Sequence, residues 1–254
     1  MTYPTVSGSS IKRKEWYEIM NELEGHLPYV NCPKCKNKGV IYYEKDGYEY
    51  SRECECMRIR RSYQRIEKSG MKDILTKYTF PTYNVESEWQ KDIKTKAEKF
   101  AKNPEKCIYI GGQVGIGKTH LCTAIVGQLI KRGSEARYMK WRDDVVAIKQ
   151  NANSDEYNRL IEPFKSVKVL YIDDLFKVKK GEQPTPADVN IAFEIINYRY
   201  LNEGLITVIS SEKTGKELIE IDEAVGSRIV EMSGYYFINI GHDTKKNYRL
   251  RGII

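Results

Sequence analysis

The stretch that decides the fold is Gly112-Gln113-Val114-Gly115-Ile116-Gly117-Lys118-Thr119. It matches the phosphate-binding loop G-x-x-x-x-G-K-[ST], the Walker A motif, at every fixed position. The apolar residues 107–110 before it predict a strand, and the residues 118–131 predict a helix. In that setting the backbone N–H groups of the loop and the helix N-terminus point at one place and hold an anion.

The motif predicts a role for each part of the loop. All eight residues from 112 to 119 are predicted to bind ATP. Lys118 would reach the β- and γ-phosphates, and the hydroxyl of Thr119 would ligate Mg²⁺. The alternative is a glycine-rich turn that happens to end in Lys-Thr, and the flanking strand and helix argue against it.

Two carboxylates follow a second apolar run. Residues 168–172 predict a strand, and Asp173 and Asp174 come directly after it. Ligands of parallel α/β folds bind at the carboxyl ends of the strands, so both acids can share a crevice with the phosphate loop. Asp173 would hold Mg²⁺, directly or through water, and Asp174 would polarise or orient the attacking water. The alternative is that the acids merely end a strand.

The chain from residue 107 onward alternates between predicted strands and helices. Further strands are predicted over 136–140, 205–210 and 235–240, and further helices over 143–150, 155–164, 187–201 and 222–232. This alternation predicts an α/β fold with a parallel sheet covered by helices on both faces. A polar helix is predicted ahead of it, over 87–101.

Ser211 and Glu212 follow the predicted strand 205–210. A polar group at this point could hydrogen-bond the γ-phosphate or the attacking water and report the state of the nucleotide. The alternative is a simple strand-ending turn.

Arg228 lies near the end of the predicted helix 222–232, in Gly226-Ser227-Arg228-Ile229. An arginine there is poorly placed for its own site but well placed to reach the γ-phosphate of a neighbouring subunit. Supplied in trans, it would stabilise the charge of the transition state. The alternative is an arginine in a surface salt bridge.

Four of the six cysteines form two close pairs, Cys32 with Cys35 and Cys54 with Cys56. The residues between the pairs predict a β-hairpin, which brings the pairs together. Four thiolates converging there make a tetrahedral zinc site, and metal binding would supply much of the folding free energy of so small a module. The alternatives are a redox C-x-x-C motif and unpaired cysteines. The other two cysteines are predicted to be core residues.

The composition is that of a soluble globular protein, with 30% charged and 41% hydrophobic residues in a chain of 254. No apolar run approaches the roughly 20 residues of a membrane span, and the N-terminus lacks the basic-then-apolar order of a secretory signal. We therefore expect a cytoplasmic protein. The net charge of +7 is compatible with nucleic acid as a partner.

Two helical segments flank the cysteine module. Residues 10–27 predict a helix, broken at Gly25, whose apolar stripe could dock on a partner, although packing on the cysteine module is the simpler interpretation. Residues 57–72 predict a basic helix that could contact phosphates or present a solvated face. Its basic residues are Arg58, Arg60, Arg61, Arg65, Lys68 and Lys72. We place the domain boundary between 1–75 and 76–254.

In this order, these landmarks resemble the bacterial and phage replicative helicase loaders of the DnaC/DnaI type. The resemblance covers nearly the whole chain from about Cys32 onward, and the ordered set is more specific than any single motif. It is carried by the cysteine module, Cys54-Glu55-Cys56-Met57, Thr79-Phe80, residues 112–119, residues 170–175 and Gly226-Ser227-Arg228.

The resemblance implies an AAA+ ATPase domain after an N-terminal zinc-binding domain that interacts with the helicase. Lys118 and Thr119 carry over as the Walker A pair, Asp173 as the Walker B magnesium acid and Arg228 as an arginine finger. The paired helices between 141 and 167 match the region where initiator-type relatives insert a helix against single-stranded DNA. The basic candidates for DNA contact there are Arg142, Lys149 and Arg159.

The function implied is that of an ATP-switched loader with Mg²⁺ and Zn²⁺ as cofactors. It would form homo-oligomers through its ATPase domains, bind the hexameric replicative helicase and help to place it on single-stranded DNA. One alternative is a transposition helper ATPase that binds duplex DNA, but such helpers lack a zinc module. Another is a non-hydrolysing adaptor in which zinc and ATP shape a protein-binding surface.

Three features depart from the family pattern. Asp174 stands where the catalytic glutamate is usual, which fits slow, switch-like hydrolysis. Glu212 stands at the position of the sensor asparagine, and an acid that faces the γ-phosphate would repel it. We expect no C-terminal lid domain, because only residues 241–254 follow the last predicted strand.

Overall fold

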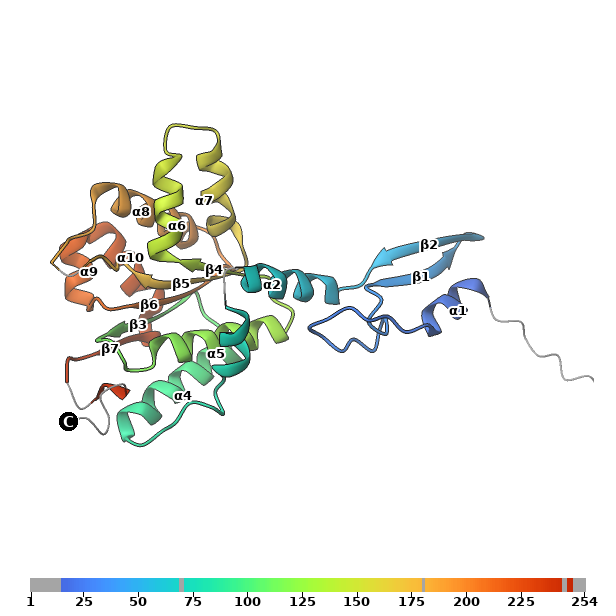
Figure 1. Ribbon diagram of the computed structural model, residues 1–254, viewed down its shortest axis with the longest axis horizontal. Coiled ribbons are helices and arrows are strands. Elements are labelled where there is room, and N and C mark those ends of the chain that lie inside the picture. The colour runs from blue at the N-terminus through green and yellow to red at the C-terminus, as the bar shows by residue number, and fades with distance from the viewer. Residues whose placement is uncertain (1–14, 69–70, 180, 244–245, 249–254) are drawn as a thin grey trace, which may run out of the picture. The chain divides into compact units, whose positions relative to one another are not determined.

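The computed structural model describes residues 15–68, 71–179, 181–243 and 246–248 (Figure 1). By the proximity of its Cα atoms the chain divides into two compact units, Met1–Arg60 and Arg61–Ile254. The division falls within a helix, α2 (Cys56–Lys68). It does not test where a functional domain begins, so the boundary after residue 75 stays a prediction. No helix in the described part of the chain is long and apolar enough to cross a membrane.

The first unit contains a short helix and the predicted hairpin. Strand β1 (Val40–Lys45) pairs antiparallel with β2 (Tyr48–Glu53), and α1 (Trp16–Glu22) lies against β1. The side-chain amide of Asn21 donates to the carbonyl of Tyr42 at 2.7 Å and accepts from its N–H at 3.0 Å. Asn21 thus replaces a strand as the hydrogen-bonding partner of this backbone segment and holds α1 on the hairpin.

The helix predicted over 10–27, with a break at Gly25, ends at Glu22, shortly before that glycine. The chain leaves the helix because Gly25 donates a backbone hydrogen bond to the carbonyl of Lys36 at 2.7 Å. A Cβ atom on Gly25 would lie 2.5 Å from the carbonyl oxygen of Asn37, so only glycine permits this approach. Residues 10–14 of the predicted helix lie outside the described residues.

The second unit is built on a five-stranded parallel sheet with the order β4-β5-β6-β3-β7. Its strands are β3 (Cys107–Gly112), β4 (Ala136–Lys140), β5 (Val169–Leu175), β6 (Ile206–Ser211) and β7 (Phe237–Ile240). Strand β6 therefore lies between the strand that precedes the phosphate loop and the strand that ends in the two acids. The predicted α/β fold with a parallel sheet is confirmed.

Helices cover both faces of this sheet, with α4 and α5 on one face and α6 to α10 on the other (Figure 1). The helices of the unit are α3 (Lys72–Lys77), α4 (Glu88–Lys102), α5 (Lys118–Lys131), α6 (Trp141–Gln150), α7 (Glu156–Ser166), α8 (Pro186–Leu201), α9 (Gly215–Ile221) and α10 (Glu223–Ser233). The sequence patterns did not predict α3 or α9. A signal for α9 was present, because Thr214 and Glu217 form a capping box at its start.

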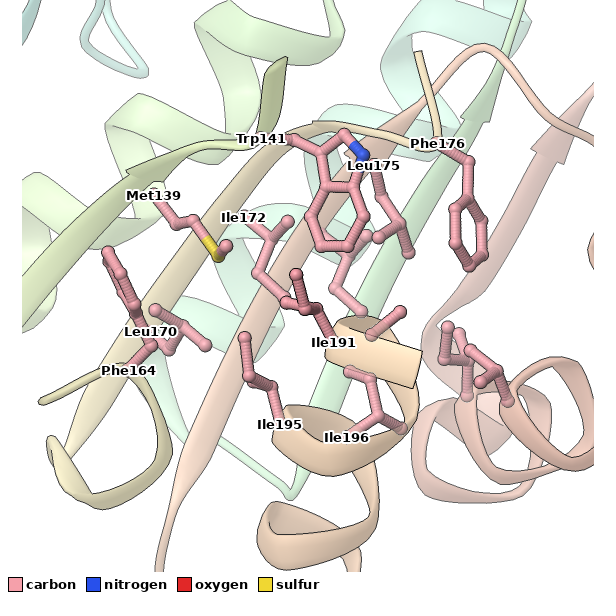
Figure 2. Close-up of a cluster of buried hydrophobic side chains, with 14 of the residues drawn as sticks. Met139, Trp141, Phe164, Leu170, Ile172, Leu175, Phe176, Ile191, Ile195 and Ile196 are labelled. Carbon is pink, nitrogen blue, oxygen red and sulfur yellow. The ribbon is translucent and has the colours of Figure 1, made fainter. Parts of the chain in front are cut away.

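Successive residues of β5 pack against opposite layers of helices. Leu170 and Ile172 belong to the buried cluster that includes Met139 and the apolar side chains of α8 (Figure 2). Val169 and Tyr171, which alternate with them, are buried as well. Because both faces are covered, this strand is a continuous apolar run in the sequence.

Arg199 is fully buried on α8 and ties that helix to the sheet. Its guanidinium donates to the hydroxyl of Thr207 at 2.8 Å. It also donates to four backbone carbonyls, those of Phe164, Lys165, Val167 and Ile206, at 3.2, 2.9, 2.9 and 2.7 Å. Burial lowers the pKa of Arg199 to about 10, so the side chain remains charged at neutral pH.

The variant Arg199→Met should lower the stability of the second unit strongly. The substitution leaves buried carbonyls without donors, and each such group costs about 1–3 kcal/mol, so we expect a loss of about 3 kcal/mol or more. Urea unfolding followed by circular dichroism measures this loss. Leu201→Ala is the matched control, because Leu201 is on the same helix and 68% exposed. Equal losses in the two variants would contradict the role given to Arg199.

Candidate functional site

The phosphate loop joins the end of β3 to the start of α5, as predicted. Gly112, Gly115 and Gly117 have φ angles of 136°, 81° and 88°, a region that favours glycine. A Cβ atom on Gly112 would lie 2.4 Å from the carbonyl oxygen of Ile240, and one on Gly117 would lie 2.8 Å from the ring of Tyr83. The loop therefore requires glycine at these positions for both conformation and space.

Lys118 begins α5, and its ammonium group donates to the carbonyls of Gly112 and Gln113 at 2.7 and 2.8 Å. Burial lowers the pKa of Lys118, and the nearby carboxylates of Asp174 and Glu212 raise it. The ammonium group can exchange the loop carbonyls for phosphate oxygens. The loop and its lysine thus fit the phosphates of a nucleotide.

A cavity of about 370 Å³ adjoins the loop. In its lining Tyr78 stacks on His120 with ring centroids 4.7 Å apart, and Tyr83 meets His120 edge-on at 5.2 Å. The charged side chains of Lys118 and Asp174 line the same cavity. Aromatic faces suit a nucleobase and charged groups suit phosphates, so the cavity has the two chemical characters that a nucleotide requires.

The carboxylate of Asp173 accepts hydrogen bonds from four hydroxyl groups. Tyr138 and Tyr171 donate at 2.8 Å each, Thr119 donates at 3.4 Å, and Ser210 donates as well. Burial, together with the Asp173 carboxylate, raises the pKa of both tyrosines well above the ordinary range, so they remain donors. Thr119 and Asp173, the predicted magnesium ligands, are thus brought together, and a hydroxyl with a carboxylate suits Mg²⁺.

Asp174 lies in a bulge at the end of β5. Between Ile172 and Leu175 this strand has one more residue than the segment of β6 opposite it. Asp174 has a φ of 57°, a left-handed conformation that Asp adopts more readily than most residues, and its N–H donates to the hydroxyl of Ser210 at 3.0 Å. With this bulge the carboxylate of Asp174 lines the cavity.

Ser210 is a residue of this site that sequence reasoning missed. Its hydroxyl connects the two acids, because it donates to the Asp173 carboxylate and accepts from the Asp174 N–H. The hydroxyl of Ser211 instead donates to the carbonyl of Leu175 at 2.7 Å and is buried. Of the two residues predicted as sensors, the structure brings Glu212 to the cavity and turns Ser211 away from it.

Lys177 is a second residue that the sequence patterns did not indicate. Its ammonium nitrogen lies 2.7 Å from a carboxylate oxygen of Asp174 and 2.9 Å from one of Glu212. Burial opposes its charge, but hydrogen bonds to these two carboxylates raise the pKa of Lys177. No motif marks this lysine, and only the turn that follows β5 brings it to the cavity.

The four predicted cysteine ligands converge in the first unit, with sulfur atoms within 4.8 Å of one another. The sulfurs of Cys32 and Cys54 are 3.8 Å apart, and those of Cys35 and Cys56 are 3.6 Å apart. Tetrahedral zinc with Zn–S bonds of about 2.3 Å places its ligand sulfurs about 3.8 Å apart. The four cysteines could therefore hold a metal ion of this kind.

The thiols of this centre differ in acidity. Burial raises the pKa of Cys35, but hydrogen bonds from the Gly39 N–H and from the other thiols lower it to about 7. Burial raises the pKa of Cys56 to about 12. Four thiolates cannot coexist here without a cation, so metal binding must displace protons and should weaken as the pH falls.

Arg60 supports the cysteine loop from helix α2. Its buried guanidinium donates to the side-chain oxygen of Asn37 at 3.0 Å, and that oxygen also accepts from the Cys32 N–H at 2.8 Å. It donates further to the backbone carbonyls of Leu27, Pro28 and Val30. Arg60 is therefore not part of the solvated basic face predicted over 57–72, because its donors satisfy buried backbone groups.

Comparison with known proteins agrees with this geometry. Residues 74–233, more than half of the chain, match the family model of the bacterial DnaA ATPase domain. The chain is 36% identical to the uncharacterized protein YqaM of Bacillus subtilis strain 168, over 87% of this chain and 86% of YqaM. It is 30% identical to the replicative helicase loader DnaC of Escherichia coli K12, over 62% of this chain and 68% of DnaC. The chain belongs to the AAA+ helicase loaders of the DnaC/DnaI type.

The AAA+ core also has the fold of a solved initiator. The structure of the replication initiator DnaA bound to AMPPCP and single-stranded DNA aligns with a TM-score of 0.55 at 25% identity, over 68% of this chain and 53% of that chain. The chain therefore spans about half the length of that DnaA. The predicted AAA+ P-loop fold and the predicted family resemblance are both confirmed.

Arg228 of this AAA+ chain lies outside its own nucleotide cavity. On α10 its guanidinium donates to the side chain of Asn197 at 3.0 Å and to the carbonyl of Ala224 at 2.8 Å. It also lies over the rings of Phe193 and Tyr200, 5.2 and 5.5 Å from their centroids. The predicted arginine finger stays a prediction, and contact with a terminal phosphate would have to involve another copy of the loader.

Lys149 differs from the other two basic residues predicted to contact DNA. Arg142 and Arg159 are exposed. The ammonium group of Lys149 lies 2.7 Å from the carboxylate of Asp188, whose side chain is only 8% exposed. Lys149 neutralises this buried acid at the start of α8, and its contact with DNA stays a prediction.

Metal analysis should find about one zinc per chain in the purified loader. Cys54→Ser removes one of the four sulfurs and should reduce the zinc content to less than about half an equivalent. The measurement is inductively coupled plasma mass spectrometry of protein purified without added zinc. Cys107→Ala is the matched control, because Cys107 is a buried cysteine of the sheet and is not one of the four. A wild-type chain with less than half an equivalent would contradict the site.

Proposed function

We propose that this protein is an ATP-switched loader that binds a replicative DNA helicase and helps to place it on single-stranded DNA when replication starts. ATP binding would drive assembly of the complex, and slow hydrolysis would release it. The observation that carries the proposal is the 30% identity to the E. coli helicase loader DnaC over 68% of that protein. The alignment of the AAA+ core with DnaA bound to AMPPCP and single-stranded DNA supports it.

The nucleotide site supports ATP as the switching ligand. The phosphate loop presents Lys118 and Thr119, and the hydroxyl of Thr119 contacts the Asp173 carboxylate that would share Mg²⁺ with it. Asp174 would orient the attacking water. Its carboxylate is held in an ion pair with Lys177, and a carboxylate held in this way favours slow turnover over rapid catalysis.

The first unit offers apolar side chains to the helicase. On α1 and directly after it, Trp16, Ile19 and Leu23 are 44, 48 and 51% exposed, and on the hairpin Tyr48 and Tyr50 are 69 and 45% exposed. Exposed aromatic and aliphatic side chains gathered on a small module are typical of protein-binding surfaces. We assign helicase binding to residues 1–75, with a zinc ion at the four cysteines maintaining the surface.

The AAA+ core would supply the DNA contacts and the contacts between subunits. Arg142 and Arg159 lie on α6 and α7 and are exposed, so they can reach a phosphate backbone. Arg228 would act on the ATP of a neighbouring copy, which makes hydrolysis depend on assembly. Its hydrogen bonds to Asn197 and Ala224 hold it on the surface of α10, where a neighbour can approach.

The loader should co-purify with the replicative helicase of its host. With ATP present we expect a stable complex by size-exclusion chromatography, and with ADP a weaker one. Cys32→Ser should abolish the complex in both cases, because the metal maintains the helicase-binding unit. Cys107→Ala is the control and should bind as the wild type does. No helicase complex under any condition would reject the loader function.

The arginine finger is tested by mixing two inactive variants. Asp174→Asn and Arg228→Ala should each reduce ATP turnover in the presence of single-stranded DNA, the arginine variant by about 10³-fold. A mixture should recover part of the turnover, because an Asp174→Asn subunit can supply its arginine to the intact site of its neighbour. Lys216→Ala, which changes an 87% exposed lysine on α9, should leave turnover unchanged. If the ATP turnover of the mixture does not exceed the summed turnover of the two variants measured separately, Arg228 does not act on the site of a neighbouring subunit.

A further inference from the structure

The nucleotide cavity brings two acids to the place where the terminal phosphate of ATP belongs. The carboxylates of Asp174 and Glu212 line the same cavity as Lys118, and both affect the pKa of that lysine. Like charges repel strongly where solvent is partly excluded, so two bare carboxylates here would oppose the γ-phosphate. A cation must compensate them if this site is to bind ATP.

Lys177 is placed to be that cation. Its ammonium nitrogen lies 2.7 Å from Asp174 and 2.9 Å from Glu212, and all three side chains are about one-third exposed, at 34, 30 and 33%. An ammonium group has three N–H donors, and these two carboxylates occupy two of them. The third donor is available to a phosphate oxygen, and Lys177 lines the cavity beside the loop.

The backbone after β5 is folded to bring Lys177 to this position. Asp174 and Phe176 have φ angles of 57° and 60°, and the N–H of Lys177 donates to the Asp174 carbonyl at 2.9 Å. The turn is anchored because Phe176 is fully buried against Trp141, with ring centroids 5.5 Å apart. Two non-glycine residues in left-handed conformations cost free energy, which is usual where a site must be held in one geometry.

We propose that Lys177 senses the terminal phosphate of ATP, with Glu212 as the acidic partner that holds it in the cavity when that phosphate is absent. The proposal rests on ATP binding by the phosphate loop, as given under the proposed function. It accounts for a glutamate at the sensor position, because Glu212 positions the sensing cation and does not itself face the phosphate. Contact with a γ-phosphate oxygen would also loosen the hold of Lys177 on Asp174.

The test is the ratio of the dissociation constants for ADP and ATP, measured with fluorescent nucleotides and Mg²⁺ on the full-length chain. For Lys177→Met we expect ATP affinity to fall about tenfold or more and ADP affinity to change less than about twofold; tenfold corresponds to about 1.4 kcal/mol. Lys177→Arg retains the charge and should retain the ratio. In the double variant Lys177→Met/Glu212→Gln, ATP affinity should recover in part, because the uncompensated carboxylate is gone.

Lys179→Met is the matched control, because it removes the same charge from an exposed lysine of the same loop that does not line the cavity. It should leave both affinities unchanged. If Lys177→Met loses ATP and ADP affinity equally, or loses neither, Lys177 is not a sensor of the terminal phosphate. That result would not affect the proposal that the wild-type chain binds ATP. A wild-type chain that binds neither nucleotide would instead reject the proposed function.

Discussion

Four hydroxyl groups from four different elements converge on the carboxylate of Asp173. They come from Tyr138 on β4, Tyr171 on β5, Ser210 on β6 and Thr119 at the start of α5. The carboxyl ends of parallel strands meet at one edge of the sheet, and this shared acceptor holds them in register there. The position of the phosphate loop relative to the carboxyl ends of these strands depends on this carboxylate.

Cationic side chains that are buried or half-buried play a comparable part elsewhere in the chain. Arg60 satisfies backbone carbonyls that would otherwise be unpaired around the cysteine loop, and Arg199 does so where α8 meets the sheet. Lys177 compensates two carboxylates beside the phosphate loop. The basic composition of the loader therefore serves its interior as well as its surface, so the net charge alone overstates the cations available to DNA.

Much of the fold could be predicted because its signals are local. The phosphate loop, the apolar strands and the two cysteine pairs are recognised from residues close together in the chain, and their predicted convergence is observed. Helix α9 was missed although Thr214 and Glu217 carry a capping signal, since the helix is short and follows a strand directly. The first helix ends near the predicted break at Gly25, but nothing local shows that Gly25 pairs with Lys36.

The sequence by itself determined that the chain has a nucleotide-binding loop, a pair of acids at a strand end and a four-cysteine centre. Each of these is defined by spacing along a continuous stretch or across a hairpin. Only the tertiary structure decided which side chains complete the site. Ser210 serves it because β6 lies between β3 and β5, and Lys149 pairs with Asp188 because α6 packs near the start of α8. Such pairings join residues far apart in the chain, so they follow from strand order and helix packing and leave no local pattern.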